Sequence, residues 1–203
     1  IGKEFLHKDV VDAARESALR VLTQGSLHYG GGRAGVEACC NQDYARIWAK
    51  LLLQKYFLDD RFEQQVQEDL DYMVDHFHIS GVPDEDCDGT KRALLGKDQL
   101  LLEPAEYYGL MIVPLCIGYE LFGREKWLHA AVRLCNHVVR SSFLDEENCR
   151  RVHRAYYAKS DGSWGRLTQP MQIQGNGLTL YGISCCARLT GNRELEKFLA
   201  EME

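Results

Sequence analysis

Apolar residues recur at spacings of three and four along most of the chain, which is the period of an α-helix that buries one face. The clearest example is 60–77, where Phe62, Val66, Leu70 and Met73 fall on one stripe. The same spacing predicts seven helices and no strand. The expected helices cover residues 9–22, 43–57, 60–77, 105–122, 124–143, 178–189 and 193–202.

Three boundaries between these helices share one short pattern. The segments YFLDDRF at 56–62, LFGREKW at 121–127 and LTGNREL at 189–195 align without gaps and lie 65 and 68 residues apart. Glycine, a common helix terminator, occupies the third position of the last two segments. Leu58 stands there in the first segment, so we expect a slightly different turn. The seventh position is the first apolar anchor of the next helix. The pattern predicts repeated antiparallel helical hairpins, which form a solenoid or a closed ring.

The other connections between the expected helices are long, at 23–42, 78–104 and 144–177. Because every tight joint of stacked antiparallel hairpins lies at one end, the long connections must all lie at the other. Long loops in compact domains are usually functional or disordered, and loops on a rigid scaffold commonly carry binding groups. We therefore expect a binding site at that end.

The composition describes an ordinary globular domain. The 203 residues are 45% hydrophobic and 27% charged, with a net charge of -6, and fit one domain spanning 1–203. The absence of a basic stripe argues against nucleic acid as a partner, and the short apolar runs argue against a membrane span. Eight cysteines occur without any Cys-x-x-Cys pair, which favours reduced thiols and a cytoplasmic setting.

The segment GNGLTLYGISCCAR followed by LTGNREL resembles the inner-helix and outer-helix unit of the (α/α) toroid enzymes, the six-hairpin glycosidase-like superfamily. That group contains glycoside hydrolases, some polysaccharide lyases and sugar epimerases. The resemblance implies that 43–57, 105–122 and 178–189 are inner helices whose N-termini face the active-site mouth. Six hairpins need more than seven helices, so the chain is expected to be a fragment or a half-ring. A second copy or a companion chain would then complete the ring.

Carboxylates on different connections are candidates for acid/base chemistry. Glu106 at the start of an inner helix and Asp161 in KSDGSWGR could form the pair that glycoside hydrolysis requires. His28 is a third catalytic candidate. It lies with Tyr29 and Arg33 around a triple glycine, which is typical of a flexible flap. Two alternatives stay open. The segment around the triple glycine could be a mobile surface loop without a binding role. Glu106 could be an acid whose negative charge only stabilises the helix dipole.

Amide and aromatic side chains near the same end are candidates for sugar binding, because amides bind hydroxyl groups and aromatic faces stack on sugar rings. They are Tyr107, Tyr108, Trp164, Gln169, Gln172, Gln174 and Asn176. We expect a carbohydrate ligand and carboxylate chemistry, with no metal and no cofactor.

Two other function classes remain possible. An apolar, terpenoid-like ligand would be favoured if Trp48, Leu110, Met111 and Ile117 faced a cavity. A non-catalytic helical scaffold that binds a partner protein is the third hypothesis. The DGSWG segment partly resembles the Gly-x-Trp turn of squalene cyclases, but the chain has no DxDD acid motif.

The cysteines also permit two hypotheses, a zinc site and a thioester. Glu37 and Cys39 before an inner helix, with the later Cys185-Cys186 pair, are similar to the zinc ligands of toroid-type β-L-arabinofuranosidases, against packed cysteines as the alternative. Cys39 with Gln42 has the spacing of a complement-like thioester, without the usual residues between them.

Overall fold

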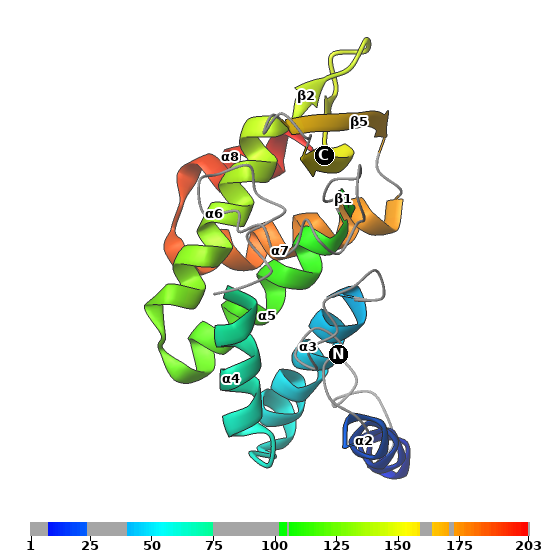
Figure 1. Ribbon diagram of the computed structural model, residues 1–203, viewed down its shortest axis with the longest axis vertical. Coiled ribbons are helices and arrows are strands. Elements are labelled where there is room, and N and C mark those ends of the chain that lie inside the picture. Colours follow the sequence, from blue (N-terminus) through cyan, green and yellow to red (C-terminus); the bar gives the residue numbers. More distant parts are fainter. Residues whose placement is uncertain are drawn as a thin grey trace.

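The computed structural model describes residues 8–23, 40–74, 102–104, 106–158, 164–170 and 173–202. Within these ranges the chain is mostly helical, with short strands at one end (Figure 1). The helices are α2 (Lys8–Leu22), α3 (Cys40–Phe57), α4 (Glu63–Tyr72), α5 (Glu106–Phe122), α6 (Glu125–Ser141), α7 (Ile173–Thr190) and α8 (Arg193–Glu201). The strands are β1 (Leu102–Pro104), β2 (Phe143–Leu144), β3 (Arg150–Arg151), β4 (His153–Ala158) and β5 (Trp164–Pro170).

The third residue of each predicted joint adopts the left-handed conformation. Leu58, Gly123 and Gly191 have φ angles of 54°, 69° and 62°, all in the left-handed region. Each of their N–H groups donates to the carbonyl oxygen four residues earlier. The repeated hairpins α3–α4, α5–α6 and α7–α8 are therefore confirmed. The expectation of a slightly different turn at Leu58 is confirmed. The leucine adopts the left-handed conformation that glycine adopts cheaply. Helix α4 begins only at Glu63, five residues later, whereas α6 and α8 begin two residues after Gly123 and Gly191.

The predicted apolar anchors after the joints are also confirmed. Phe62, Trp127 and Leu195 are 8%, 0% and 0% exposed. The Trp127 ring packs edge-on against Phe122, and its Nε1 donates a hydrogen bond to Asp71 at 2.8 Å. Each anchor fixes the second helix of a hairpin against the first.

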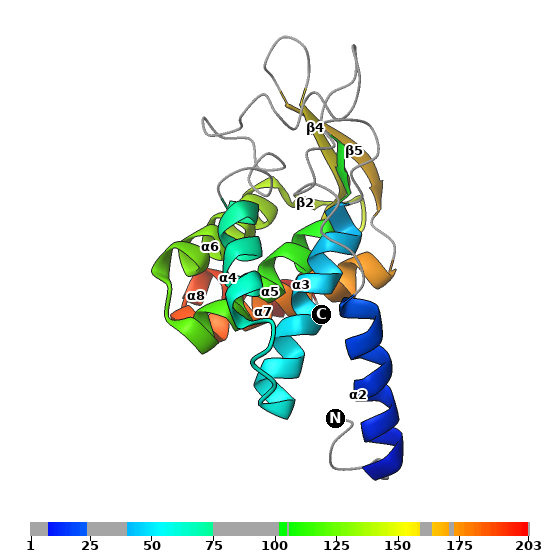
Figure 2. The ribbon, with the colours of Figure 1, turned by 60° about the horizontal axis from the view of Figure 1, so that its bottom comes forward.

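The hairpins build two layers. One layer holds α3, α5 and α7 side by side, with α5 in the middle, and the other holds α4, α6 and α8 (Figures 1 and 2). The core lies between the layers, and almost every residue of α5 from Tyr108 to Gly118 is buried. Helix α2 packs on α3 and is joined to the α3–α4 turn by an ion pair of 2.7 Å between Arg15 and Asp59.

The expectation that the chain has no strand was wrong. Strands β1, β4 and β5 form an antiparallel sheet in the order β1-β4-β5, and β2 pairs with β3. Tyrosine, tryptophan and threonine in β4 and β5 favour extended backbone, but the neighbouring charges and glycines indicated a loop. Since β1 belongs to the expected 78–104 connection and β4 to 144–177, the pairing shows that these two connections meet.

Helix α7 begins at Ile173, five residues before the expected start at 178. The two glycines at 175 and 177 indicated a loop, because glycine is a weak helix former. Packing against α5 overrides that preference.

Candidate functional site

The three helices of the α3–α5–α7 layer run parallel and in register. Glu120 of α5 accepts hydrogen bonds of 2.6 Å from Lys55 of α3 and from Arg188 of α7. Further toward the N-terminal ends, the rings of Trp48 and Tyr181 stack with centroids 6.3 Å apart, which connects α3 directly to α7. The helices are thus side by side at two points along their length. Because they run in the same direction, their first turns lie at the same end of the layer.

Helices α5 and α7 approach each other closely near their first turns. A Cβ built on Gly109 would lie 2.4 Å from the carbonyl oxygen of Leu178, and a Cβ on Gly182 would lie 3.1 Å from the Cβ of Ile112. Only glycine fits at Gly109 without displacing backbone. One turn before this contact lie Glu106 on α5 and residues 174–176 on α7. The backbone of Glu106 therefore stands beside the first turn of α7.

The β1-β4-β5 sheet lies at this same end. Strand β1 leads into α5, and β5 leads into α7 (Figure 2). In the register of the sheet, Glu103 of β1 is paired with Tyr156 of β4, and Tyr156 is paired with Arg166 of β5. The sheet and the first turns of two parallel helices therefore form one composite end, which we call the sheet end.

Several predicted site residues fall at the sheet end by their place in the elements. Glu106 and Tyr107 begin α5, Trp164 and Gln169 lie in β5, and Gln174 lies in the first turn of α7. Asn176 is half-buried on α7. The helices and strands that carry these candidates come from two separate connections, and they meet at one end of the structure.

Tyr108 is fully buried, unlike a residue at an open mouth. Its ring lies 5.5 Å from the ring of His137 on α6, and that histidine is also buried. Both rings belong to the core beneath the sheet end. His137 was not among the predicted site residues, and no sequence motif marks it.

The remaining candidates lie outside the described residues. They are His28, Tyr29 and Arg33 of the flap, Asp161, and Gln172. The possible zinc ligands Glu37 and Cys39 lie outside them as well. Cys185 and Cys186 are described, and they lie within α7 among packed helices.

The opposite end of the layer carries the Lys55–Glu120–Arg188 charge triad, which the sequence reasoning missed. The three residues lie 65 and 68 positions apart, the same offsets that separate the joints. Burial raises the pKa of Glu120, but hydrogen bonds from Lys55 and Arg188 outweigh it, so the carboxyl pKa lies below its ordinary value. The repeat alignment could have revealed the triad.

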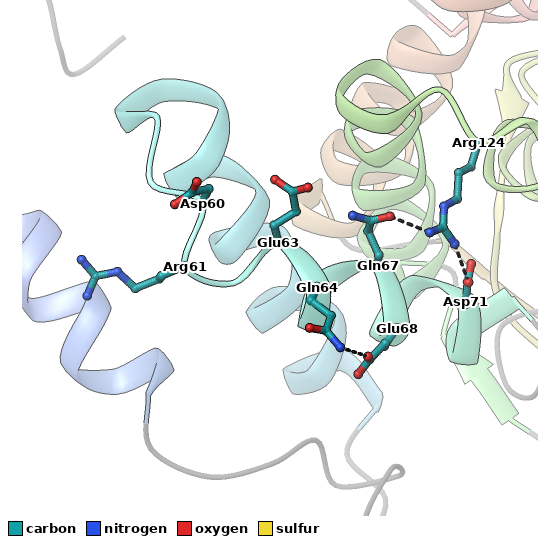
Figure 3. A pocket seen from close by; sticks show the side chains of 8 residues that line it. All are labelled: Asp60, Arg61, Glu63, Gln64, Gln67, Glu68, Asp71 and Arg124. Atoms are coloured by element: carbon teal, nitrogen blue, oxygen red, sulfur yellow. Dashed lines mark hydrogen bonds and ion pairs between the residues drawn. The ribbon is translucent and has the colours of Figure 1, made fainter.

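A polar groove of about 510 Å³ lies at the joint end, along α4 (Figure 3). Its lining residues are Asp60, Arg61, Glu63, Gln64, Gln67, Glu68, Asp71 and Arg124. Arg124 donates to Asp71 at 2.7 Å and to Gln67 at 2.6 Å, and Lys126 lies 2.9 Å from the same Asp71 carboxylate. Polar groups that line this groove thus bind one another, which indicates a structural network.

The described part of the chain contains no group of three or more histidine, cysteine or acidic side chains that could hold a metal ion. Among its helices, none combines the length and the apolar character needed to cross a membrane. Comparison with known proteins gives no family model, no curated protein and no solved structure that matches this chain.

Proposed function

We propose that this chain is an enzyme of the (α/α) toroid type that acts on a carbohydrate at the sheet end by carboxylate acid/base chemistry. The observation that carries the proposal is the side-by-side placement of the α5 and α7 first turns under one sheet. That placement brings Glu106 to the same end as the aromatic and amide positions of β5 and α7.

The proposed chemistry uses two carboxylates. Glu106 stands in the first turn of α5, and Asp161 falls between β4 and β5 in the sequence. Glycoside hydrolysis needs one carboxylic acid to protonate the leaving oxygen and one carboxylate to act as a base or nucleophile. Free N–H groups at the starts of α5 and α7 would stabilise negative charge that develops nearby.

Substrate binding in this proposal uses Trp164, Gln169, Gln174 and Asn176. Aromatic faces stack on the C–H face of a sugar ring, and amides both donate to and accept from its hydroxyl groups. The substrate contacts expected from Tyr29, Arg33, Tyr107 and Gln172 stay predictions.

The carbohydrate proposal is preferred to a terpenoid-like ligand on one observation. Trp48, Leu110, Met111 and Ile117 were expected to face an apolar cavity if the ligand were a terpenoid. Met111 and Ile117 are buried in the core between the helical layers, and Trp48 and Leu110 are half-buried and pack against that core. Their apolar surface is therefore used in packing.

We also propose that the three hairpins form part of a ring completed by a second copy or a companion chain. Tyr56 on α3 and Tyr181 on α7 are each 52% exposed, although both belong to the layer that would line such a ring. Light scattering over a range of protein concentrations would test this association.

Isothermal titration calorimetry with neutral sugars, uronic acids and prenyl alcohols tests the proposed ligand class. We expect binding of at least one sugar or uronate and none of the prenyl alcohols. Binding confined to prenyl alcohols would contradict the carbohydrate proposal. Absence of binding to any of the compounds would favour the protein-binding scaffold.

A further inference from the structure

Three buried thiols from three helices meet inside the core. Cys116 lies on α5, Cys135 on α6 and Cys186 on α7, and each is at most 1% exposed. Cys116 and Cys135 are the two groups that lower the pKa of Cys186 most, so the three thiols lie near one another. All three cysteines are free, and so are Cys149 and Cys185 among the described residues. Cys186 is therefore the centre of a sulfur cluster that no proposed catalytic step uses.

The helix geometry places Cys116 and Cys186 on facing sides of α5 and α7. A Cβ built on Gly182 would lie 3.1 Å from the Cβ of Ile112. Cys186 and Cys116 are each four residues, or about one turn, further along the same parallel helices. The close approach at Gly182 and Ile112 therefore continues toward the level of the two cysteines on facing sides of α5 and α7. Disulfides join Cβ atoms that are about 3.5–4.5 Å apart.

We propose that Cys116 and Cys186 form a reversible disulfide between α5 and α7 when the protein is exposed to hydrogen peroxide. The Cys186 sulfur attacks the peroxide O–O bond, which gives a sulfenic acid and one water. The Cys116 sulfur then attacks that sulfur, the S–S bond forms, and the hydroxyl leaves as a second water with the thiol proton. Two thiols lose two electrons, and one hydrogen peroxide becomes two waters.

Cys186 is the better nucleophile of the cluster. Hydrogen bonds from Cys116 and then Cys135 lower the pKa of Cys186 despite its burial, whereas the hydrogen bond to Cys186 and burial raise the pKa of Cys116. The thiolate is the reactive form of cysteine.

Cys116 is the preferred partner because α5 and α7 pack together more extensively than α6 and α7 do. The bond would lock the two helices whose first turns carry Glu106 and Asn176. This inference does not depend on the proposed function, since it rests on the core thiols alone.

Peptide mapping of the peroxide-treated protein tests the proposal. Free thiols are alkylated in denaturant, and the protein is digested with trypsin without reduction. We expect a linked pair of the peptides 98–124 and 167–188, which contain Cys116 and Cys186, and its loss after dithiothreitol. The midpoint of thermal unfolding should rise on oxidation, because a cross-link restricts the unfolded chain.

Alanine variants identify the linked sulfurs with little change in core polarity. The link should survive in Cys135→Ala and Cys185→Ala and disappear in Cys116→Ala and Cys186→Ala. Circular dichroism of each variant verifies that it folds. A link from 167–188 to 134–140, a link that persists in Cys116→Ala, or full alkylation of Cys116 after treatment of the folded wild type would each overturn the proposal.

Discussion

Lys55 Nζ lies 2.6 Å from Glu120 Oε2, and the two residues occupy equivalent places three positions before the joints of consecutive hairpins. Arg188 occupies the third equivalent place and donates to the other oxygen of the same carboxylate. One acid on the middle helix thus joins its two neighbours. This triad keeps α3, α5 and α7 in register and so keeps their first turns level at the sheet end.

Glu120→Gln should weaken the fold by about 1 kcal/mol at neutral pH, because it removes two partly exposed ion pairs. The pKa of Glu120 is lowered in the folded state, so its contribution is complete above the unfolded pKa and is lost as pH falls through the folded pKa. The stabilities of wild type and variant should therefore converge on acidification. Urea unfolding over a pH series measures the difference in free energy of unfolding between wild type and variant. A difference that grows toward acidic pH would contradict the stabilising role of the triad.

Leu58→Gly should stabilise the protein by about 0.5–1 kcal/mol, because relief of left-handed strain exceeds the extra entropy of unfolded glycine. The Leu58 side chain is 87% exposed, so little packing is lost. Gly123→Ala makes the reverse change at the equivalent joint and should destabilise. Both free energies of unfolding come from urea titration, and equal signs for the two variants would refute the shared turn.

Gly109→Ala should cost about 2–3 kcal/mol, since its Cβ would lie 2.4 Å from the Leu178 carbonyl oxygen and the helices would have to separate. Gly177→Ala is the matched control on α7. No atom lies within 4 Å of a Cβ there, and alanine is about 1 kcal/mol better than glycine inside a helix. Thermal unfolding of both variants tests the close approach of the helices. A Gly109→Ala variant as stable as the wild type would rule that approach out.

Asp59→Asn should release α2 from the hairpins without unfolding them. Asp59 is buried and accepts from Arg15 of α2 and from Arg61, both at 2.7 Å. Amide hydrogen exchange across α2 should accelerate roughly fivefold, which corresponds to about 1 kcal/mol of local stability. Arg61→Gln keeps the contact to Arg15 and should leave exchange in α2 unchanged. Wild-type exchange in Asp59→Asn would mean that other contacts hold α2.

The helical hairpins could be predicted because their signals are local. The joint residues and the anchors Phe62, Trp127 and Leu195 lie within seven-residue segments that align by eye. The helical periods between them reflect burial of one face. At Leu58, where the residue type differs, the left-handed residue is kept but the next helix begins three residues later than at the other joints.

The sheet end could be predicted only in outline. Strand β1 is three residues long, and its pairing with β4 depends on contacts far along the chain, so local pattern carries little signal for it. The burial of Tyr108 against His137 likewise depends on how α6 packs on α5. The charge triad was missed because the three residues differ in type and sign, although their offsets match the repeat.

The most direct test of the proposed site compares Glu106→Gln with Glu194→Gln. Both acids stand in the first turn of a helix, Glu106 on α5 at the sheet end and Glu194 on α8 at the joint end. Turnover of the sugar or uronate substrate that binds in calorimetry is measured for both variants. The account predicts at least a hundredfold loss for Glu106→Gln and wild-type turnover for Glu194→Gln, in line with the roughly 10²–10⁴-fold contribution of a general acid or base. Equal turnover in the two variants would contradict it and leave Glu106 as an acid that only satisfies the helix dipole.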